Sequence, residues 1–275
     1  MASEIHRIRS IRPDEFEQVR HLSPSTWGTD LPGFLTLHHG QPYFKGWVVE
    51  EGGGIIAFGN SLRNGNSGWL GNILVAPEAR GRGIGAAITR HLMDDLHRQG
   101  CCRLLLVATP LGEPVYTRLG FRVTGRYAFY SFDSAPAVAR HPAVRPLLPE
   151  DHPAALALDR RVTGETRTAF LSRFLDGGWV FDDGGGRAGI AGIHLPALAT
   201  GLVIASDVEA GLALLRWRLS RGECKCVVPE QNERARRCLE ELGGELTATA
   251  PRMALGREAA WRPAEVYQRA AGWCG

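Results

Sequence analysis

The sequence has 275 residues, which is enough for one large domain or for two of ordinary size. Hydrophobic residues make up 44% and charged residues 22%, a composition that excludes a largely disordered chain. The net charge of +3, from 32 basic and 29 acidic residues, is too small to indicate a nucleic-acid-binding protein by charge alone.

Cysteine spacing and the N-terminal sequence narrow the class of protein further. The six cysteines match neither a zinc site nor a disulfide framework, so we expect reduced thiols and no metal. Residues 1–14 are charged throughout, which argues against a signal peptide. No run of about 18 apolar residues occurs, so we expect no membrane-spanning segment and no membrane partner. These features predict a cytoplasmic protein.

The N-terminal part of the chain is predicted to form a short strand, a helix and two hairpins. Residues 12–14 form a turn between the strand and a helix with an apolar side. Residues 47–51 and 55–58 are predicted to pair across three glycines. Asn64-Gly65 is a second hairpin signal and leads into a strand over residues 69–75.

An amphipathic helix follows, because apolar residues recur every four positions from Ile84 to Leu96 and Gly100 supplies a C-terminal stop. The continuous apolar run at residues 103–107 predicts a strand buried on both faces. Proline in the first turn predicts a short helix over residues 114–120, and a last strand is expected over residues 121–129.

Residues 131–144 are typical of a linker, and much of the same order recurs beyond it. The predicted strands of the second half are residues 179–181, 189–194, 201–205 and 226–228, and its predicted helices are residues 206–219 and 232–242. A capping box, Ser206-x-x-Glu209, is expected to start the first of these helices. The recurrence indicates an internal duplication in which one copy is degenerate.

The motif with the clearest chemistry, Arg80-x-x-Gly83-x-Gly85, lies where a strand meets the amphipathic helix. Its glycines let the backbone approach a ligand closely, and the free amides at a helix N-terminus attract an anion. Arg80 and Arg82 can add charge-assisted contacts. The motif therefore predicts a pyrophosphate-binding loop.

Other interpretations of this segment fit less well. A P-loop needs Gly-Lys-Ser/Thr, which the sequence lacks. A dinucleotide-binding Gly-x-Gly-x-x-Gly loop is approximated by Gly81, Gly83 and Ala86, but it needs an acidic residue after the next strand, which ends instead in Val107-Ala-Thr-Pro110. A glycine-rich turn without a ligand is the purely structural alternative.

Residues 68–121 resemble the core of the GNAT superfamily of acyl-CoA-dependent N-acyltransferases. Arg80-x-x-Gly83-x-Gly85 matches that family's pyrophosphate loop, Arg/Gln-x-x-Gly-x-Gly/Ala. Tyr116-x-x-x-Gly120-Phe121 matches its Tyr-x-x-x-Gly-Phe element. The whole chain, including the segment Ala108-Thr-Pro-x-Gly112, is similar to a two-domain subgroup whose second GNAT-like unit is degenerate.

The resemblance implies an α/β (α+β) fold of tandem GNAT-like domains, each a mixed central sheet flanked by helices. Residues 1–135 would form the catalytic domain, and residues 145–275 a degenerate domain that walls the acceptor pocket. At the loop position the second copy has residues 205–211, which lack the arginine and both glycines and contain two acidic residues. Leu239 replaces the tyrosine, although Asn232 is retained at a cofactor-type position. We therefore expect no coenzyme A in the second domain.

The resemblance assigns acetyl-CoA as the co-substrate. The segment 73–75 would offer backbone groups to the pantetheine arm and thioester, and the segment 80–86 would hold the phosphates. Thr109 stands where many relatives have an asparagine that contacts the cofactor. The expected cofactor-binding residues are Ile73, Leu74, Val75, Arg80, Gly81, Arg82, Gly83, Ile84, Gly85, Ala86 and Thr109.

Tyr116 would be the catalytic general acid that protonates the departing thiolate, since its reference pKa near 10 suits that leaving group. The alternative for Tyr116 is a packed aromatic on a short helix. The implied mechanism is direct attack of a neutral amine on the thioester, with a strand amide near Val75 stabilising the oxyanion. The general base stays open among Glu51, Asp30, His38, His39 and Asn72 acting through water.

The expected function is N-acetyl transfer to a primary amine of a small molecule, by a monomer or a homodimer. One alternative is an acyltransferase that uses an aminoacyl-tRNA on the same scaffold; the intact pyrophosphate loop speaks against this nucleic-acid partner. Another is a non-catalytic acyl-CoA-binding regulatory module; retention of Tyr116 argues against it.

Overall fold

The computed structural model describes residues 7–24, 30–182, 184, 190–257 and 260–275. It divides into two compact units. Unit 1 consists of Met1–Arg122 together with Ala254–Gly256 and Gly272–Cys274, and unit 2 consists of Val123–Met253, Arg257–Ala271 and Gly275. Two short pieces of the second half of the chain therefore pack within unit 1.

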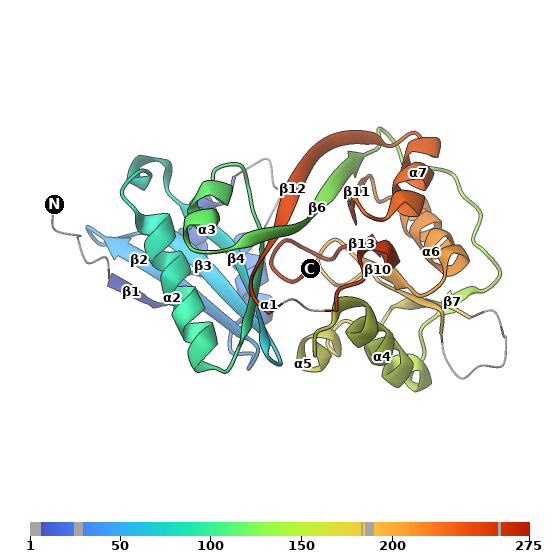
Figure 1. Cartoon of the computed structure of the whole chain (residues 1–275), viewed down its shortest axis with the longest axis horizontal. Helices are drawn as coiled ribbons and strands as arrows, with labels where there is room; N and C mark the ends of the chain where they lie inside the picture. Colours follow the sequence, from blue (N-terminus) through green and yellow to red (C-terminus); the bar gives the residue numbers. More distant parts are fainter. Residues whose placement is uncertain (1–6, 25–29, 183, 185–189, 258–259) are drawn as a thin grey trace. The chain divides into compact units, whose positions relative to one another are not determined.

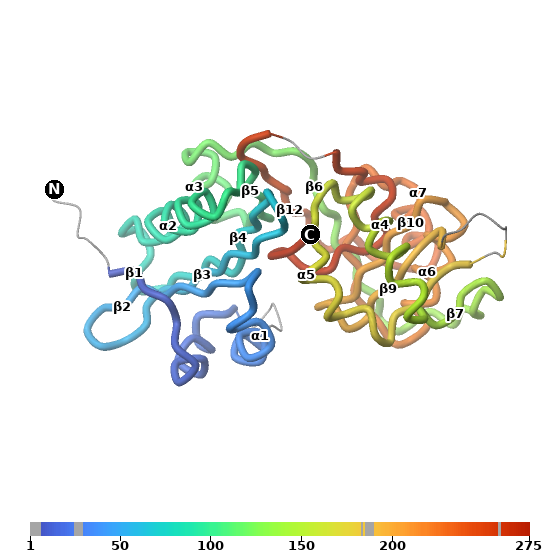
Figure 2. Tube along the Cα trace, turned by 90° about the horizontal axis from the view of Figure 1, so that it is seen from below, coloured from blue at the N-terminus to red at the C-terminus, as the bar shows by residue number. Residues whose placement is uncertain are grey.

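Unit 1 is built on the strands β1 to β5. Its elements are β1 (Arg7–Ser10), a 3₁₀ helix (Pro13–Leu22), α1 (Leu31–His38), β2 (Phe44–Glu51), β3 (Gly54–Asn64), β4 (Ser67–Val75), a second 3₁₀ helix (Pro77–Ala79), α2 (Ile84–Arg98), β5 (Arg103–Val107) and α3 (Glu113–Arg118). The strands lie in the order β1-β2-β3-β4-β5, and the end of β12 continues the sheet beside β5. Figure 1 and Figure 2 show α2 and α1 on opposite faces of this sheet.

Both predicted hairpins of the first half are confirmed. Glu51 pairs with Gly54 across a two-residue turn, and Asn64 pairs with Ser67 across the next. The expected first helix is a 3₁₀ helix rather than an α-helix.

The apolar stripe on α2 is buried as predicted, and Ile84, Ile88, Leu92 and Leu96 are all at most 1% exposed. Glycine in the strands below permits this close packing. A Cβ on Gly68 would lie 2.7 Å from Leu96.

Unit 2 contains the remaining elements, apart from Arg122 at the start of β6 and Ala254–Gly256 at the end of β12, which belong to unit 1. They are β6 (Arg122–Ser131), β7 (Val144–Pro146), a 3₁₀ helix (Pro149–Asp151), α4 (His152–Thr163), α5 (Thr168–Leu171), β8 (Trp179–Phe181), β9 (Gly192–Leu195), β10 (Leu202–Ala205), α6 (Val208–Ser220), β11 (Lys225–Pro229), α7 (Glu233–Glu241), β12 (Glu245–Gly256), a 3₁₀ helix (Pro263–Glu265) and β13 (Val266–Gln268). One sheet has the order β13-β10-β9-β8-β7, and elsewhere β12, β6 and β11 are consecutive neighbours.

The antiparallel run β7-β8-β9-β10 repeats the run β1-β2-β3-β4, as the predicted duplication requires. The copies differ after the fourth strand. In the first copy β5 pairs with β4, whereas in the second β13 pairs with β10. The predicted strand at residues 189–194 is observed as Gly192–Leu195, and residue 189 lies outside the described residues.

The predicted capping box at Ser206 is wrong. Asp207 is the N-cap of α6, and its carboxylate accepts from the amides of Glu209 and Ala210 at 2.8 and 3.1 Å. The Ser206 hydroxyl instead donates to the carbonyl of Ala191 at 3.1 Å. A carboxylate one position later reaches the same orphan amides, and its charge also suits the positive end of the helix.

Candidate active site

The strands β4 and β5 pair at one end only. Their parallel register joins residues 67–69 to residues 103–105. In the described part of the chain, the rest of β4 is paired with β3 on its other side. The backbone groups of Ile73, Leu74 and Val75 that face away from β3 are therefore available to a ligand.

A bulge interrupts β4 just before these residues. The register with β3 shifts between Phe58 and Asn60, and Asn72 has a left-handed backbone with φ 47°. Asparagine tolerates this conformation better than most residues. Asn72 Nδ2 donates to Asn60 Oδ1 at 2.9 Å, while Asn60 is fully buried and its Nδ2 has no hydrogen-bond partner among the described residues.

The glycine-rich loop adopts the geometry expected of an anion-binding turn. Gly81 and Gly83 have φ of 77° and 82°, and a Cβ on either would meet no atom within 4 Å. Gly83 is the N-cap of α2, and no side chain caps this helix start. The amides of the first turn, residues 84–86, have no acceptor within the helix. The positive end of the α2 dipole and the unfilled space around Gly81 and Gly83 therefore lie at the same place.

The two loop arginines have different partners. Arg80 Nε donates to the carbonyl of Val75 at 3.1 Å, so its side chain lies at the end of β4. Arg82 donates to both carboxylate oxygens of Glu51, at 2.8 and 2.5 Å. Glu51, a candidate general base in the sequence, is therefore engaged by the loop.

Tyr116 lies on α3, a helix that contacts α2. Its ring packs over Gly112, where a Cβ would lie 2.7 Å from Cε2, and against Phe121 at 6.1 Å between centroids. Tyr116 is 8% exposed, and burial raises the pKa of its hydroxyl to about 12. No described residue hydrogen-bonds this hydroxyl. Thr109 is exposed, and its hydroxyl accepts from the Gly112 amide at 3.2 Å.

The C-terminal part of unit 1 brings a residue to β4 that sequence reasoning missed. Trp273 packs on Gly71, where a Cβ would lie 2.2 Å from Trp273 Cβ, so only glycine permits the contact. The Trp273 ring also contacts Phe34 and His38 of α1, at 4.8 and 5.0 Å between centroids. No local pattern links residue 273 to a strand two hundred positions earlier. Asn60 was missed as well, because no sequence motif includes it.

The remaining candidates for the general base lie in different surroundings. Asp30 pairs with Arg20 at 3.4 Å, and both side chains are exposed. His39 is exposed. His38 is 1% exposed, and its Nδ1 lies 3.4 Å from the hydroxyl of Tyr43. Of the five candidates, Asn72 lies at the bulge of β4, and His38 contacts Trp273, which packs on Gly71.

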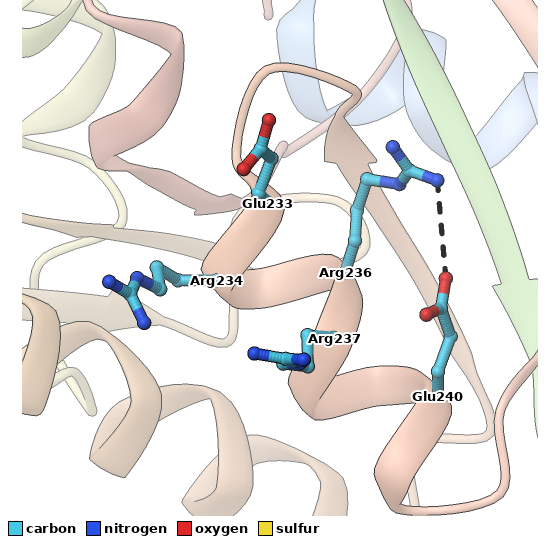
Figure 3. A pocket seen from close by; sticks show the side chains of 5 residues that line it. All are labelled: Glu233, Arg234, Arg236, Arg237 and Glu240. Atoms are coloured by element: carbon cyan, nitrogen blue, oxygen red, sulfur yellow. Dashed lines mark ion pairs between the residues drawn. The ribbon is translucent and has the colours of Figure 1, made fainter.

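One surface hollow of the described residues contains none of these candidates. Figure 3 shows it along α7, lined by three basic and two acidic side chains: Glu233, Arg234, Arg236, Arg237 and Glu240. Glu240 accepts from the hydroxyl of Tyr130 at 2.8 Å, and Arg236 donates to the same hydroxyl oxygen at 3.3 Å. These hydrogen bonds hold α7 against Tyr130 of β6, and none of the side chains involved is a candidate catalytic group.

The described residues form neither a metal-binding cluster nor a membrane-spanning helix. In the described ranges, no group of three or more His, Cys, Asp or Glu side chains is placed to hold a metal ion. Nor does any helix of those ranges combine the length and apolar character needed to cross a membrane.

Comparison with known proteins agrees with the motif analysis. Residues 42–123 match the family model for the acetyltransferase (GNAT) domain. No curated protein sequence matches the chain.

Solved structures resemble the chain over nearly its whole length. A presumed acetyltransferase of Pyrococcus horikoshii has a TM-score of 0.82 and 18% identity, covering 100% of this chain and 98% of the other. A GCN5-related N-acetyltransferase from Sphaerobacter thermophilus has a TM-score of 0.62, 17% identity and coverages of 93% and 98%. A tandem GNAT protein from the clavulanic acid biosynthesis pathway has a TM-score of 0.58, 16% identity and coverages of 91% and 98%. The fold is that of tandem GNAT proteins.

Proposed function

We propose that this chain, whose residues 42–123 are a GNAT acetyltransferase domain, transfers an acetyl group from acetyl-CoA to a primary amine of a small molecule. The observation that carries the proposal is the uncapped start of α2, with Gly81 and Gly83 in left-handed conformations beside the open end of β4. A pyrophosphate and an extended pantetheine arm are the ligand that this pair of features suits.

Different groups of the chain would bind the phosphates, bind the pantetheine arm and stabilise the developing oxyanion. The amides of residues 84–86 and the guanidinium groups of Arg80 and Arg82 hold the phosphates. The backbone at Ile73 to Val75 binds the pantetheine arm and donates to the developing negative charge on the thioester oxygen. Thr109 contributes a hydroxyl at the end of β5. Residues 1–135 would form the catalytic part, and the bound acetyl-CoA supplies an activated acyl group.

Tyr116 would protonate the sulfur as the C–S bond breaks. Its raised pKa keeps the proton on the hydroxyl at neutral pH, so the acid form is the populated one. The amine attacks as the neutral base and loses its extra proton at the β4 bulge, where Asn72 lies. The acetyl group moves from sulfur to nitrogen, the nitrogen loses one proton, and the sulfur gains one.

The second half supports a single coenzyme A site. At the equivalent helix start, the carboxylate of Asp207 already occupies the amides of α6. Where unit 1 leaves β4 open, unit 2 has β13 beside β10, and Arg269 N donates to the Val227 carbonyl of β11 at 2.9 Å. Residues 145–275 therefore serve acceptor recognition and architecture in this proposal.

The test is acetyl-CoA binding by calorimetry. We expect one site per chain and a loss of affinity of at least about 100-fold in Gly83→Asp, because the new carboxylate repels the phosphates and strains a positive-φ position. Gly100→Asp is the matched control: it has φ 86° and open space but lies beyond the far end of α2. Two equivalent sites, or equal losses in both variants, contradict the proposal. Binding without turnover across an amine library favours the regulatory module.

A further inference from the structure

The bulge of β4 turns one side chain toward the neighbouring strand. Where β3 carries Gly59 between two paired residues, β4 carries both Asn72 and Ile73. An extra residue of this kind bends the strand and re-aims a side chain. Asn72 occupies the position with a left-handed backbone, and its Nδ2 donates to Asn60 Oδ1 at 2.9 Å. Two side-chain amides are thus joined at the bulge.

Asn60 is buried on the face of the sheet that Trp273 covers. Gly59 turns toward α2, where a Cβ would lie 3.2 Å from Ile88, so the next side chain of β3 lies on the other face. There a Cβ on Gly71 would lie 3.3 Å from Asn60 Nδ2 and 2.2 Å from Trp273 Cβ. The amide of Asn60 is therefore enclosed near Trp273, and the residue is 0% exposed.

This environment is unfavourable for an asparagine. Asn60 Nδ2 is buried without a hydrogen-bond partner among the described residues. The hydrogen bond that Asn60 Oδ1 accepts comes from Asn72, a half-buried residue. A leucine of similar volume would avoid the cost of the unpaired donor. The contact with Asn72, rather than stability, is thus what Asn60 provides.

The amide pair fixes which atom Asn72 presents. Among the described residues, the bond to Asn60 is the one side-chain hydrogen bond of Asn72, and it uses Nδ2. Turning the Asn72 amide over would set its oxygen against Asn60 Oδ1. Asn72 Oδ1 therefore stays an acceptor. It belongs to the residue directly before Ile73 to Val75, the backbone proposed to hold the thioester.

We propose that Asn60 is a positioning residue for the acceptor amine, an assignment that rests on the proposed function. Asn60 holds Asn72 so that Asn72 Oδ1 accepts an N–H of the amine while the nitrogen lone pair attacks the thioester carbonyl. The oxygen orients the nucleophile, since a lone pair points away from a bonded N–H. A neutral amide takes no proton, so the proton that nitrogen loses passes to water.

Two substitutions of Asn60 separate positioning from packing. Asn60→Leu removes the unpaired donor together with the bond to Asn72, and we expect an equal or higher melting temperature with kcat at least about tenfold lower. Asn60→Asp keeps an acceptor for Asn72 Nδ2 but buries a carboxyl group. We expect it to have a lower melting temperature and a kcat within about threefold of the wild type. Activity that follows stability in both variants, or a large fall in the melting temperature of Asn60→Leu, overturns the proposal.

A double-mutant cycle tests whether Asn60 acts through Asn72. In an Asn72→Ala background, Asn60→Leu should cause no further loss of kcat, whereas losses that multiply overturn the assignment. Ser61→Ala is the matched control. Ser61 is the next buried residue of β3, and its side chain lies on the other face, so this variant should keep the wild-type kcat.

The kinetics use the full chain, acetyl-CoA and the primary amine that the wild type acetylates fastest in the amine library. Calorimetry should show that every variant binds acetyl-CoA as the wild type does, because the glycine-rich loop is unchanged. A wild type that acetylates no amine contradicts the proposed function and this proposal with it. An active wild type and an equally active Asn60→Leu contradict the positioning role alone.

Discussion

Tyr116 and His194 show how burial sets the protonation state of single residues. Tyr116 is held against Gly112 and Phe121, and burial raises its pKa to about 12. His194, on β9, is 2% exposed, and burial together with the charges of Arg218 and Arg221 lowers its pKa to about 3. Each group is therefore neutral near pH 7, one as an acid that holds its proton and the other as a base that lacks one.

Replacing Tyr116 by phenylalanine keeps the ring but removes the hydroxyl. We expect turnover to fall by about 10- to 10⁴-fold, the range for loss of a general acid, with little change in acetyl-CoA affinity. Steady-state kinetics and calorimetry measure the two effects, and Tyr130→Phe in unit 2 is the control. Since the acid form exists below its pKa of about 12, ionisation of Tyr116 should not lower wild-type turnover up to about pH 10. Full activity of Tyr116→Phe between about pH 6 and 10 would leave Tyr116 with a packing role alone.

His194 makes stability depend on pH in a defined direction. The unfolded chain binds a proton at His194 near pH 6.5, whereas the folded chain does so near pH 3. Stability is thus present above pH 6.5 and is lost as the pH falls, by about 2 kcal/mol between about pH 6.5 and 5. Urea unfolding at both pH values should show a smaller loss in His194→Gln. His91, whose pKa burial also lowers, is unchanged in that comparison. An equal loss in the variant would assign the pH dependence elsewhere.

The starts of α2 and α6 differ in whether a side chain caps them. The helix α2 begins at Gly83 with no side-chain cap, and its first amides face open space. The helix α6 begins at Asp207, whose carboxylate satisfies the corresponding amides. An external anion and an internal one are alternative partners for the same backbone dipole. The Asp207 carboxylate takes up two of the amides that would otherwise be donors to a pyrophosphate.

The cap of α6 can be tested by comparing neighbouring substitutions. Asp207→Ala should lower the free energy of unfolding by about 0.5–2 kcal/mol, because two amides lose their acceptor. Ser206→Ala should change it far less, since its hydroxyl bonds only the Ala191 carbonyl at an exposed position. Chemical denaturation of both variants measures the difference. A larger effect at Ser206 would restore the capping box.

The chain as a whole does not separate into its two halves at the linker. Residues 254–256 and 272–274 pack in unit 1, although they are distant from it in sequence. Conversely, β6 follows α3 directly but pairs with β11 in unit 2, from Tyr127 with Pro229 to Ser131 with Lys225. The division of function into residues 1–135 and 145–275 remains a proposal, and the packing units cross it.

A fragment of residues 1–140 should therefore be poorly soluble. It loses residues 254–256 beside β5, Trp273 over Gly71, and the β11 partner of β6, which exposes strand edges and apolar surface. Size-exclusion chromatography should show aggregation, and co-expression of residues 141–275 should restore a soluble complex. Any soluble fraction should keep acetyl-CoA affinity and lose acceptor turnover. A soluble, fully active fragment would show that the second half takes no part in catalysis.

Local patterns in the sequence predicted most of the elements. The hairpin at Asn64-Gly65, the apolar stripe of α2 and the short helix before Gly120 depend on residues a few positions apart. The proposed pyrophosphate loop depends on equally local residues, because Arg80, Gly83 and Gly85 lie within six consecutive residues of a strand–helix junction. Such signals can be recognised in a single sequence, because propensity and spacing depend on residues only a few positions apart.

The contacts that the sequence did not predict depend on the tertiary structure. It engaged Glu51 with Arg82, placed Trp273 on Gly71 and moved the cap of α6 from Ser206 to Asp207. It also placed Arg269 against the rings of Tyr127 and Phe129 on β6. Apart from the cap of α6, these contacts join residues between 31 and more than 200 positions apart. The energies of the contacts depend on burial and charge balance in the folded chain. Spacing along a sequence carries no record of which distant side chain will cover a glycine or leave a cation buried.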